Sequence, residues 1–123
     1  MKGFAARDAE FARLKELARH RPIYCTETGW HTAPSTVRTG WFGLFRRKVR
    51  FTDEQVADFF DREVTIHERN GAEVFAWFQL NDGPNPDDYE QTFGIRRLNG
   101  ELKPVGVRAS ASAARLAGGP VSV

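Results

Sequence analysis

Apolar residues recur along the chain at two spacings, the helical spacing of three to four residues and the alternation typical of strands. Each stretch with one of these spacings predicts a helix or a strand. Over residues 7–20 the apolar positions follow helical spacing, and Pro22 ends that helix because it cannot donate a backbone hydrogen bond. The apolar stripe consists of Phe11, Leu14, Leu17 and Ala18. The pattern therefore predicts a helix with one apolar side.

The next helix is predicted from its start and stop signals. Thr52 is followed three residues later by Gln55, which is the capping-box pattern, and Asn70-Gly71 is a common helix end. The apolar stripe of this helix consists of Val56, Phe59, Phe60, Val64 and His67. A last helix is expected to begin at Lys103-Pro104, because proline is favoured in a first helical turn.

Two short apolar runs, residues 23–28 and 74–80, predict buried strands. Alternation places Ile23, Cys25 and Glu27 on one face of the first strand, and both of its faces are largely apolar. Strands covered on both sides are typical of parallel sheets. The strand–helix–strand order therefore predicts an α/β fold with a right-handed parallel crossover.

Residues 29–51 are predicted to form a long loop. Loops of this length are usually functional or disordered, and the aromatic content argues against disorder. No acid lies between Glu27 and Asp53. The aromatic and basic residues of the loop are Trp30, Trp41, Phe42, Phe45, Arg38, Arg46, Arg47, Lys48 and Arg50. We divide the chain into one domain, residues 1–117, and a flexible tail, residues 118–123.

Composition excludes several classes of protein. A chain of 123 residues, 41% hydrophobic and 28% charged, has the composition of one globular domain. The net charge of +2 is too small to indicate a nucleic-acid partner, and the single Cys25 excludes an internal disulfide. No run approaches the roughly 20 apolar residues that span a bilayer, and no secretory signal is visible. Membrane association is therefore not expected, and the cellular location stays open.

Glu27 is the candidate catalytic residue, because it is the only charge in its strand and stands at the C-terminal end. Eight-stranded α/β barrels build their active sites at that end of the strands. The alternative is a carboxylate that caps the following loop or pairs with one of its arginines. The acids of residues 82–90 do not follow the EF-hand spacing, and Pro84 and Pro86 stiffen that loop. We therefore predict neither a metal nor a cofactor.

Residues 8–116 resemble the C-terminal portion of the clan A glycoside hydrolases, a superfamily of (β/α)8 barrels. The segment Thr26-Glu27-Thr28-Gly29-Trp30 is similar to the end of their seventh strand, and residues 74–83 are similar to the eighth. Glycoside hydrolase families five and thirty-nine are the nearest in pattern. The resemblance implies a partial TIM barrel, consisting of the last two parallel strands with flanking helices, and a carbohydrate substrate.

The resemblance also implies roles for single residues. Glu27 matches the nucleophile of a retaining mechanism, and Trp77 matches the tryptophan at the cleavage subsite, so we expect these two groups side by side. Trp30 and His31 would line the same mouth. The remaining candidates are Trp41, which would stack on a further sugar, and Asp82, which would bind a hydroxyl group. Packing against the loop or the barrel rim is the alternative for the aromatic residues, and turn formation is the alternative for Asp82.

One part of the chemistry is missing from the chain. Retaining hydrolysis needs a second carboxyl group about 5 Å from the first. Clan A takes that proton donor from an Asn-Glu pair after the fourth strand, and this sequence contains no Asn-Glu pair. A full barrel needs about 250 residues. We therefore expect a fragment that is inactive alone.

Unpaired strand edges favour association, so we also expect self-association or a complementary barrel piece. The alternatives are a non-catalytic carbohydrate-binding or scaffold remnant, and an unrelated small α/β protein.

Overall fold

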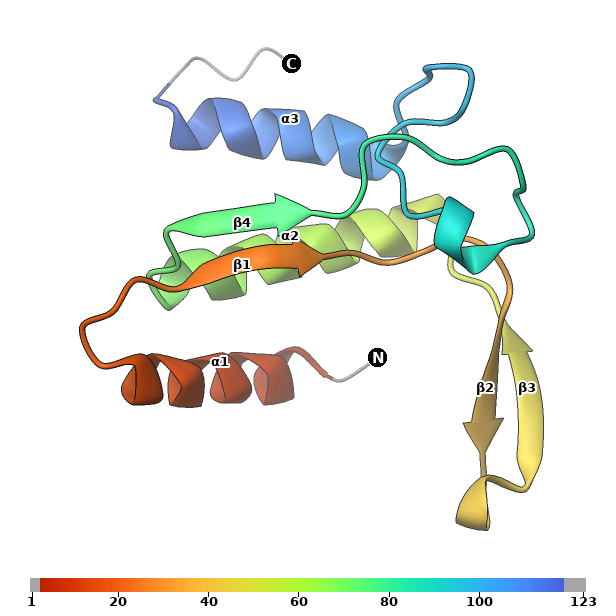
Figure 1. Cartoon of the computed structure of the whole chain (residues 1–123), viewed down its shortest axis with the longest axis horizontal. Helices are drawn as coiled ribbons and strands as arrows, with labels where there is room; N and C mark the ends of the chain where they lie inside the picture. Colours follow the sequence, from red (N-terminus) through yellow and green to blue (C-terminus); the bar gives the residue numbers. More distant parts are fainter. Residues whose placement is uncertain (1–2, 119–123) are drawn as a thin grey trace.

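The computed structural model describes residues 3–118 of the 123 (Figure 1). Its elements, in chain order, are α1 (Phe4–Ala18), β1 (Tyr24–Thr28), β2 (Ser35–Thr39), the 3-10 turn η1 (Trp41–Gly43), β3 (Phe45–Val49), α2 (Asp53–Arg69), β4 (Val74–Trp77), the 3-10 turn η2 (Tyr89–Gln91) and α3 (Pro104–Leu116). The mixed α/β class with parallel strands and flanking helices is confirmed. Of the expected tail, residues 119–123 lie outside the described part.

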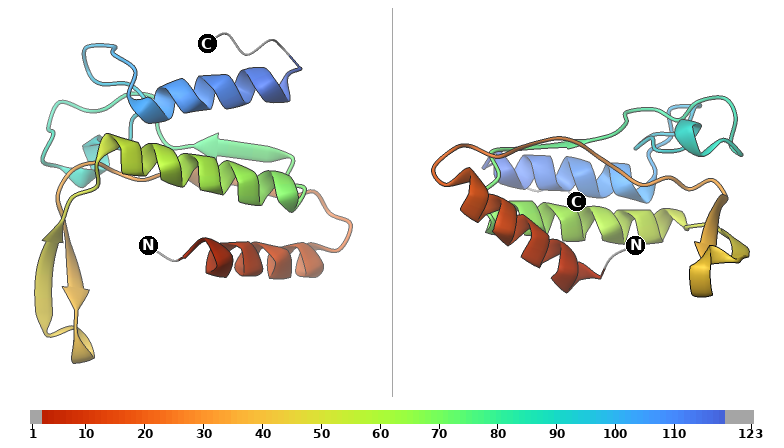
Figure 2. Two further views of the ribbon diagram at one scale, coloured as in Figure 1. Left: turned by 180° about the vertical axis from the view of Figure 1, so that it is seen from behind. Right: turned by 60° about the horizontal axis from the view of Figure 1, so that its bottom comes forward.

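The strands β1 and β4 pair in parallel and are joined through α2. Tyr24 lies opposite Val74, and Thr28 lies opposite Trp77. The three helices lie on one side of this two-stranded sheet (Figure 2). One sheet face is therefore covered by helices, and the other is open within the described chain.

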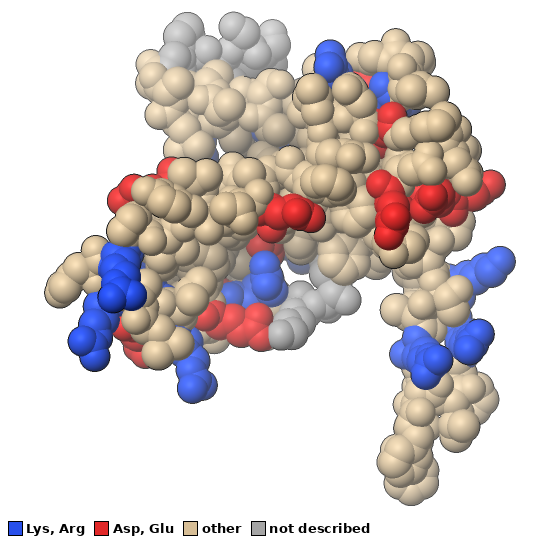
Figure 3. Space-filling model, viewed as in Figure 1, with Lys and Arg blue, Asp and Glu red and all other residues tan. Residues whose placement is uncertain are grey.

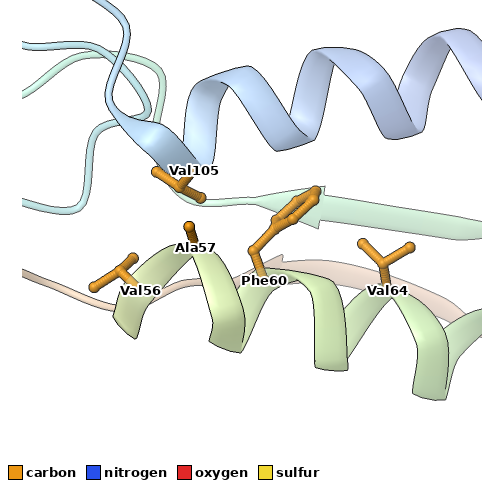
Figure 4. Packing of buried hydrophobic residues seen from close by; sticks show 5 residues of the cluster. All are labelled: Val56, Ala57, Phe60, Val64 and Val105. Carbon is orange, nitrogen blue, oxygen red and sulfur yellow. The ribbon is translucent and has the colours of Figure 1, made fainter. Parts of the chain in front are cut away.

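The core forms where α2 packs against β4 and against α3, and every residue of the predicted α2 stripe is buried there. Phe60 of α2 packs edge-on against Phe75 and Trp77 of β4, with ring centroids 5.8 and 5.3 Å apart. The buried cluster consists of Val56, Ala57, Phe60, Val64 and Val105 (Figure 4). The predicted stripe of this helix is thus confirmed, and it holds β4 to the helical layer.

The helix boundaries follow from the local signals in the sequence. Thr52 accepts a hydrogen bond from the Gln55 N–H and donates its own N–H to the Gln55 side chain, at 3.1 and 2.9 Å. Asn70 caps the other end, and Gly71 adopts a φ of 70° that favours glycine. Pro104 is the first residue of α3, as expected.

The first helix forms as predicted, but its apolar stripe is not buried. Leu14 and Leu17 are 47% and 72% exposed, and Leu14 lines an open hollow between α1 and β1. Polar contacts attach the helix to α2 instead: Arg7 donates two hydrogen bonds to Glu63, at 3.1 and 2.8 Å. Phe11 also packs edge-on against His67.

The prediction of a long loop over residues 29–51 is wrong. Residues 35–49 form an antiparallel hairpin, with Ser35 opposite Val49 and Thr39 opposite Phe45. Glycines at positive φ, Gly40 and Gly43, allow the chain to reverse at the tip. We call residues 35–49 the arm, because in Figure 1 they project away from the rest of the molecule.

Two statements about the strands also need correction. The second strand ends at Trp77 rather than at residue 80. The expectation that β1 is covered on both faces is wrong for the described chain, since Tyr24 is 55% exposed and Val74 is 45% exposed. The helices cover one face only, and no described element lies over the other.

The hand of the crossover stays a prediction. Over residues 3–118, no helix combines the length and apolar character that a membrane crossing requires.

Candidate functional site

An open hollow of about 540 Å³ lies at the C-terminal ends of β1 and β4. The residues that line it are Glu27, Thr28, Gly29, Phe78, Tyr89, Glu90 and Phe93. They come from the ends of both parallel strands and from the segment around η2. The hollow therefore occupies the strand end at which α/β barrels build their sites.

Glu27 reaches this hollow because the pairing of β1 is irregular. Cys25 pairs with Phe75 and Thr28 with Trp77, so three residues of β1 span two of β4. Cys25 is half-buried, whereas Thr26 and Glu27 are both exposed. Strict alternation predicts Glu27 on the Cys25 face, and the irregularity breaks that alternation.

Gly29 lets β1 and β4 approach closely just beyond Glu27. The Phe78 N–H donates to the Thr28 carbonyl at 2.7 Å. A Cβ atom on Gly29 would collide with the Phe78 carbonyl oxygen. Only glycine fits here without movement, so the Gly after Thr28 sets the position of Phe78 next to Glu27.

Phe78, and not Trp77, is the aromatic residue of β4 that lines the hollow with Glu27. Trp77 packs against Phe59 and Phe60 of α2, and it lines a separate hollow between α2, β4 and α3. The expectation that the Trp77 indole lies beside Glu27 is therefore wrong. The physical reason is the alternation of side chains along a strand, which sends neighbouring residues to opposite sides.

The other four predicted residues lie in four different places. The His31 ring packs against Phe93 and Tyr89, which line the hollow, with centroids 5.5 and 5.6 Å apart. Trp30 packs into the core against Phe51 and Phe59. Of the two, only His31 contacts residues that line the hollow.

Trp41 and Asp82 do not line the hollow. Trp41 stands at the tip of the arm and is 84% exposed. Asp82 accepts hydrogen bonds from the Gly94 N–H and from the Lys103 ammonium group, each at 2.8 Å. Lys103 is 2% exposed and also donates to the Thr92 carbonyl, so Asp82 neutralises a buried charge.

The hollow also contains residues that the sequence did not single out. Phe93 meets Phe78 edge-on, with centroids 5.6 Å apart. The Tyr89 hydroxyl donates to Glu90 at 3.0 Å, and this hydrogen bond raises the pKa of Tyr89. Asp88 caps η2 by accepting a hydrogen bond from the Glu90 N–H. An Asp in a capping position before Tyr-Glu-Gln could have predicted this turn from the sequence.

The arrangement combines one exposed carboxylate with an aromatic wall. Glu27 lies with Phe78, Tyr89 and Phe93, while Glu90 supplies a second carboxylate on the η2 side. Such a wall suits the apolar face of a sugar ring, and carboxylates suit its hydroxyl groups. Within residues 3–118, no three His, Cys, Asp or Glu side chains gather in a geometry that could hold a metal ion.

Comparison with known proteins gives one informative result. No protein-family model matches the chain, and no curated protein matches it. In fold, the chain is similar to a family 39 glycoside hydrolase. That structure, from the gut symbiont Bacteroides cellulosilyticus WH2, matches with a TM-score of 0.66 and 21% sequence identity. The match covers 86% of this chain but 20% of that one, so the chain spans about a fifth of the length of its structural neighbour.

Proposed function

We propose that this chain supplies the last two strand–helix units of a clan A glycoside hydrolase barrel, related more closely to family 39 than to family five. The main observation in support of this proposal is that Glu27 and Phe78 line one open hollow at the C-terminal ends of two parallel strands. The similarity in fold to a family 39 glycoside hydrolase supports the same proposal. The chain is accordingly a carbohydrate-active fragment of a partial TIM barrel.

In this proposal Glu27 is the nucleophile of a retaining reaction. Its carboxylate attacks the anomeric carbon, the bond to the leaving oxygen breaks, and that oxygen takes a proton from an acid. Water then releases the sugar from Glu27. Phe78 takes the role that the family resemblance implied for Trp77, as the wall of the subsite, and Tyr89 and Glu90 bind hydroxyl groups.

The acid comes from outside this chain in the proposal, because the sequence has no Asn-Glu pair. Loss of general acid catalysis alone lowers the rate by about 10²–10⁴-fold. The chain by itself is then inactive. A complementary barrel piece, or a second copy, pairs with the edges of β1 and β4 and covers the open sheet face. The proposal includes neither a nucleic-acid nor a membrane partner.

Reconstitution tests the catalytic proposal. The purified chain is mixed with a protein piece that carries the first six strand–helix units of a family 39 glycoside hydrolase, and release of an aryl group from aryl glycosides is measured. We expect turnover with the wild-type chain and background release with Glu27→Gln. Glu16→Gln is the matched control, since it makes the same change on the exposed side of α1.

Covalent trapping then identifies the nucleophile. A 2-deoxy-2-fluoro glycoside stalls a retaining enzyme at the glycosyl intermediate, and mass spectrometry of peptides locates the label. The label is expected on Glu27. A label on Glu90, or equal turnover for wild type and Glu27→Gln, would remove Glu27 from the role of nucleophile.

A non-catalytic sugar-binding remnant is the second candidate, because this chain supplies aromatic residues that line the hollow but no Asn-Glu pair. Titration of the isolated chain with methyl glycosides, followed by amide NMR, separates the two candidates. Shifts around Phe78 and Phe93 without turnover in any reconstituted mixture would favour the remnant.

A further inference from the structure

Three of the four cations of the arm lie on one face of its two strands, and Arg47 lies on the other face. The register places Arg38 opposite Arg46 and Lys48 opposite Thr36, so the three cations share a face. Residues directly opposite in an antiparallel pair have Cβ atoms about 5 Å apart, and like charges there destabilise the pair. This cationic face, made of Arg38, Arg46 and Lys48, therefore gains from a bound anion.

The chain supplies no neutralising group on the arm. No Asp or Glu lies between Glu27 and Asp53, and the described part of the chain gives the three cations no ion pair. All three are exposed, and Figure 3 shows the Lys and Arg side chains of the arm apart from the acidic side chains of the body. The planar guanidinium fork of arginine matches carboxylate and sulfate groups.

The tip of the arm adds exposed aromatic rings. Trp41 and Phe42 are 84% and 85% exposed, and their ring centroids lie 5.1 Å apart. Large aromatic side chains this exposed are costly in water unless a ligand covers them. Trp41 follows Arg38 by three residues and Phe42 precedes Arg46 by four, so exposed rings that can cover sugars lie near the cations along the chain.

The base of the arm is fixed to the wall of the hollow. The Ala33 N–H donates to the Thr92 hydroxyl at 3.0 Å, and the Thr32 N–H donates to the Thr92 carbonyl at 3.3 Å. Thr92 directly precedes Phe93, which lines the hollow. In Figure 1 the arm leaves the body next to η2, whose residues Tyr89 and Glu90 line the hollow.

The hollow and the arm have opposite charge. Glu27 and Glu90 line the hollow, so an acidic sugar there would be repelled. The acidic groups of a ligand fit the arm instead. The two regions together select a chain that is neutral at one position and anionic further along.

We propose that the arm is a distal binding site for a glycan that carries carboxylate or sulfate groups. The neutral residue of that glycan occupies the hollow, and its acidic residues lie on Arg38, Arg46 and Lys48, with Trp41 and Phe42 against its rings. This inference rests on the proposed function, because it takes the hollow as a sugar site.

Calorimetric titration of the full chain with oligogalacturonate tests the arm, and the methyl ester of the same oligosaccharide is the matched uncharged ligand. We expect binding of the acid form and at least about tenfold weaker binding of the ester, since charged hydrogen bonds are lost. The double variant Arg38→Gln/Arg46→Gln should weaken binding of the acid form about tenfold. Arg13→Gln/Arg21→Gln is the control with the same loss of charge at exposed sites elsewhere, and it should leave affinity unchanged.

Three outcomes would overturn the inference. These are equal affinity for acid and ester, an equal loss in the control variant, and tighter arm-dependent binding to phosphatidylglycerol vesicles or to a short DNA duplex. Circular dichroism confirms that each variant folds. Since Glu27→Gln leaves the arm intact, binding to the arm that persists without reconstituted activity would contradict the proposed function alone. Reconstituted activity without binding to the arm would contradict this inference alone.

Discussion

The two faces of the β1–β4 sheet differ in almost every physical respect. Toward the helices, Trp77 packs on Phe60 and the side chains interlock into a core. On the opposite face and at the strand ends, Tyr24, Glu27 and Phe78 are exposed. The covered face supplies the stability of the described chain, and the open face carries its candidate chemistry.

The difference between these faces shows how neighbouring residues acquire unrelated roles. Trp77 and Phe78 are adjacent aromatic residues, and either could be assigned to a sugar site by composition alone. The pleat of the strand places Trp77 against the helices and Phe78 in the hollow with Glu27.

Replacing Trp77 or Phe78 by alanine should give the largest difference in stability between the two faces. Trp77→Ala removes a ring from the packing against α2 and is expected to lower the free energy of unfolding by about 3 kcal/mol. Phe78→Ala, whose side chain is 38% exposed, should cost about 1 kcal/mol. Urea unfolding followed by circular dichroism measures both. A larger loss of stability for Phe78→Ala would reverse the assignment of the two faces.

The next contrast is between a buried and an exposed ion pair. Lys103→Met leaves Asp82 without its ammonium partner in a buried site and should cost about 3 kcal/mol. Arg115→Met breaks the exposed pair with Glu68 and should cost about 0.5 kcal/mol. The same unfolding experiment tests this order, which equal losses in the two variants would contradict.

Loss of the side-chain cap at the start of α2 should lower the stability by a smaller amount. Thr52→Ala removes the side-chain oxygen that accepts the Gln55 N–H and should cost about 1 kcal/mol. Thr52→Ser keeps that oxygen and is expected to stay close to wild type. If Thr52→Ser lowered the stability as much as Thr52→Ala, loss of the side-chain cap would not be the cause of the effect.

The smallest effect concerns Cys25, where the sheet faces the helices. Burial raises the pKa of its thiol above the ordinary value of 9.0, so less reactive thiolate is present in the folded chain. Alkylation by iodoacetamide at pH 8 should be slower in the folded chain than in guanidinium chloride. Because the folded chain holds this proton more tightly, the contribution of Cys25 to stability should be complete below pH 9.0 and decrease as the pH rises further. Equal alkylation rates would indicate an accessible thiol.

The sequence by itself determined the local features. Helical spacing and the capping signals located α2 and α3, since the Thr52–Gln55 box and Pro104 act within a few residues. The parallel pairing of β1 with β4 followed from the strand–helix–strand order. The same local reasoning identified Glu27 as a charge at a strand end.

Only the tertiary structure decided which side chains meet. The break in pairing after Cys25 released Glu27 from strict alternation, and no local pattern announced it. Residues 35–49 pair across the chain as a hairpin, although the sequence predicts a loop over residues 29–51. Asp82 and Lys103 form a buried pair because segments distant in sequence fold over one another, and distant contacts leave no periodic signal in the sequence.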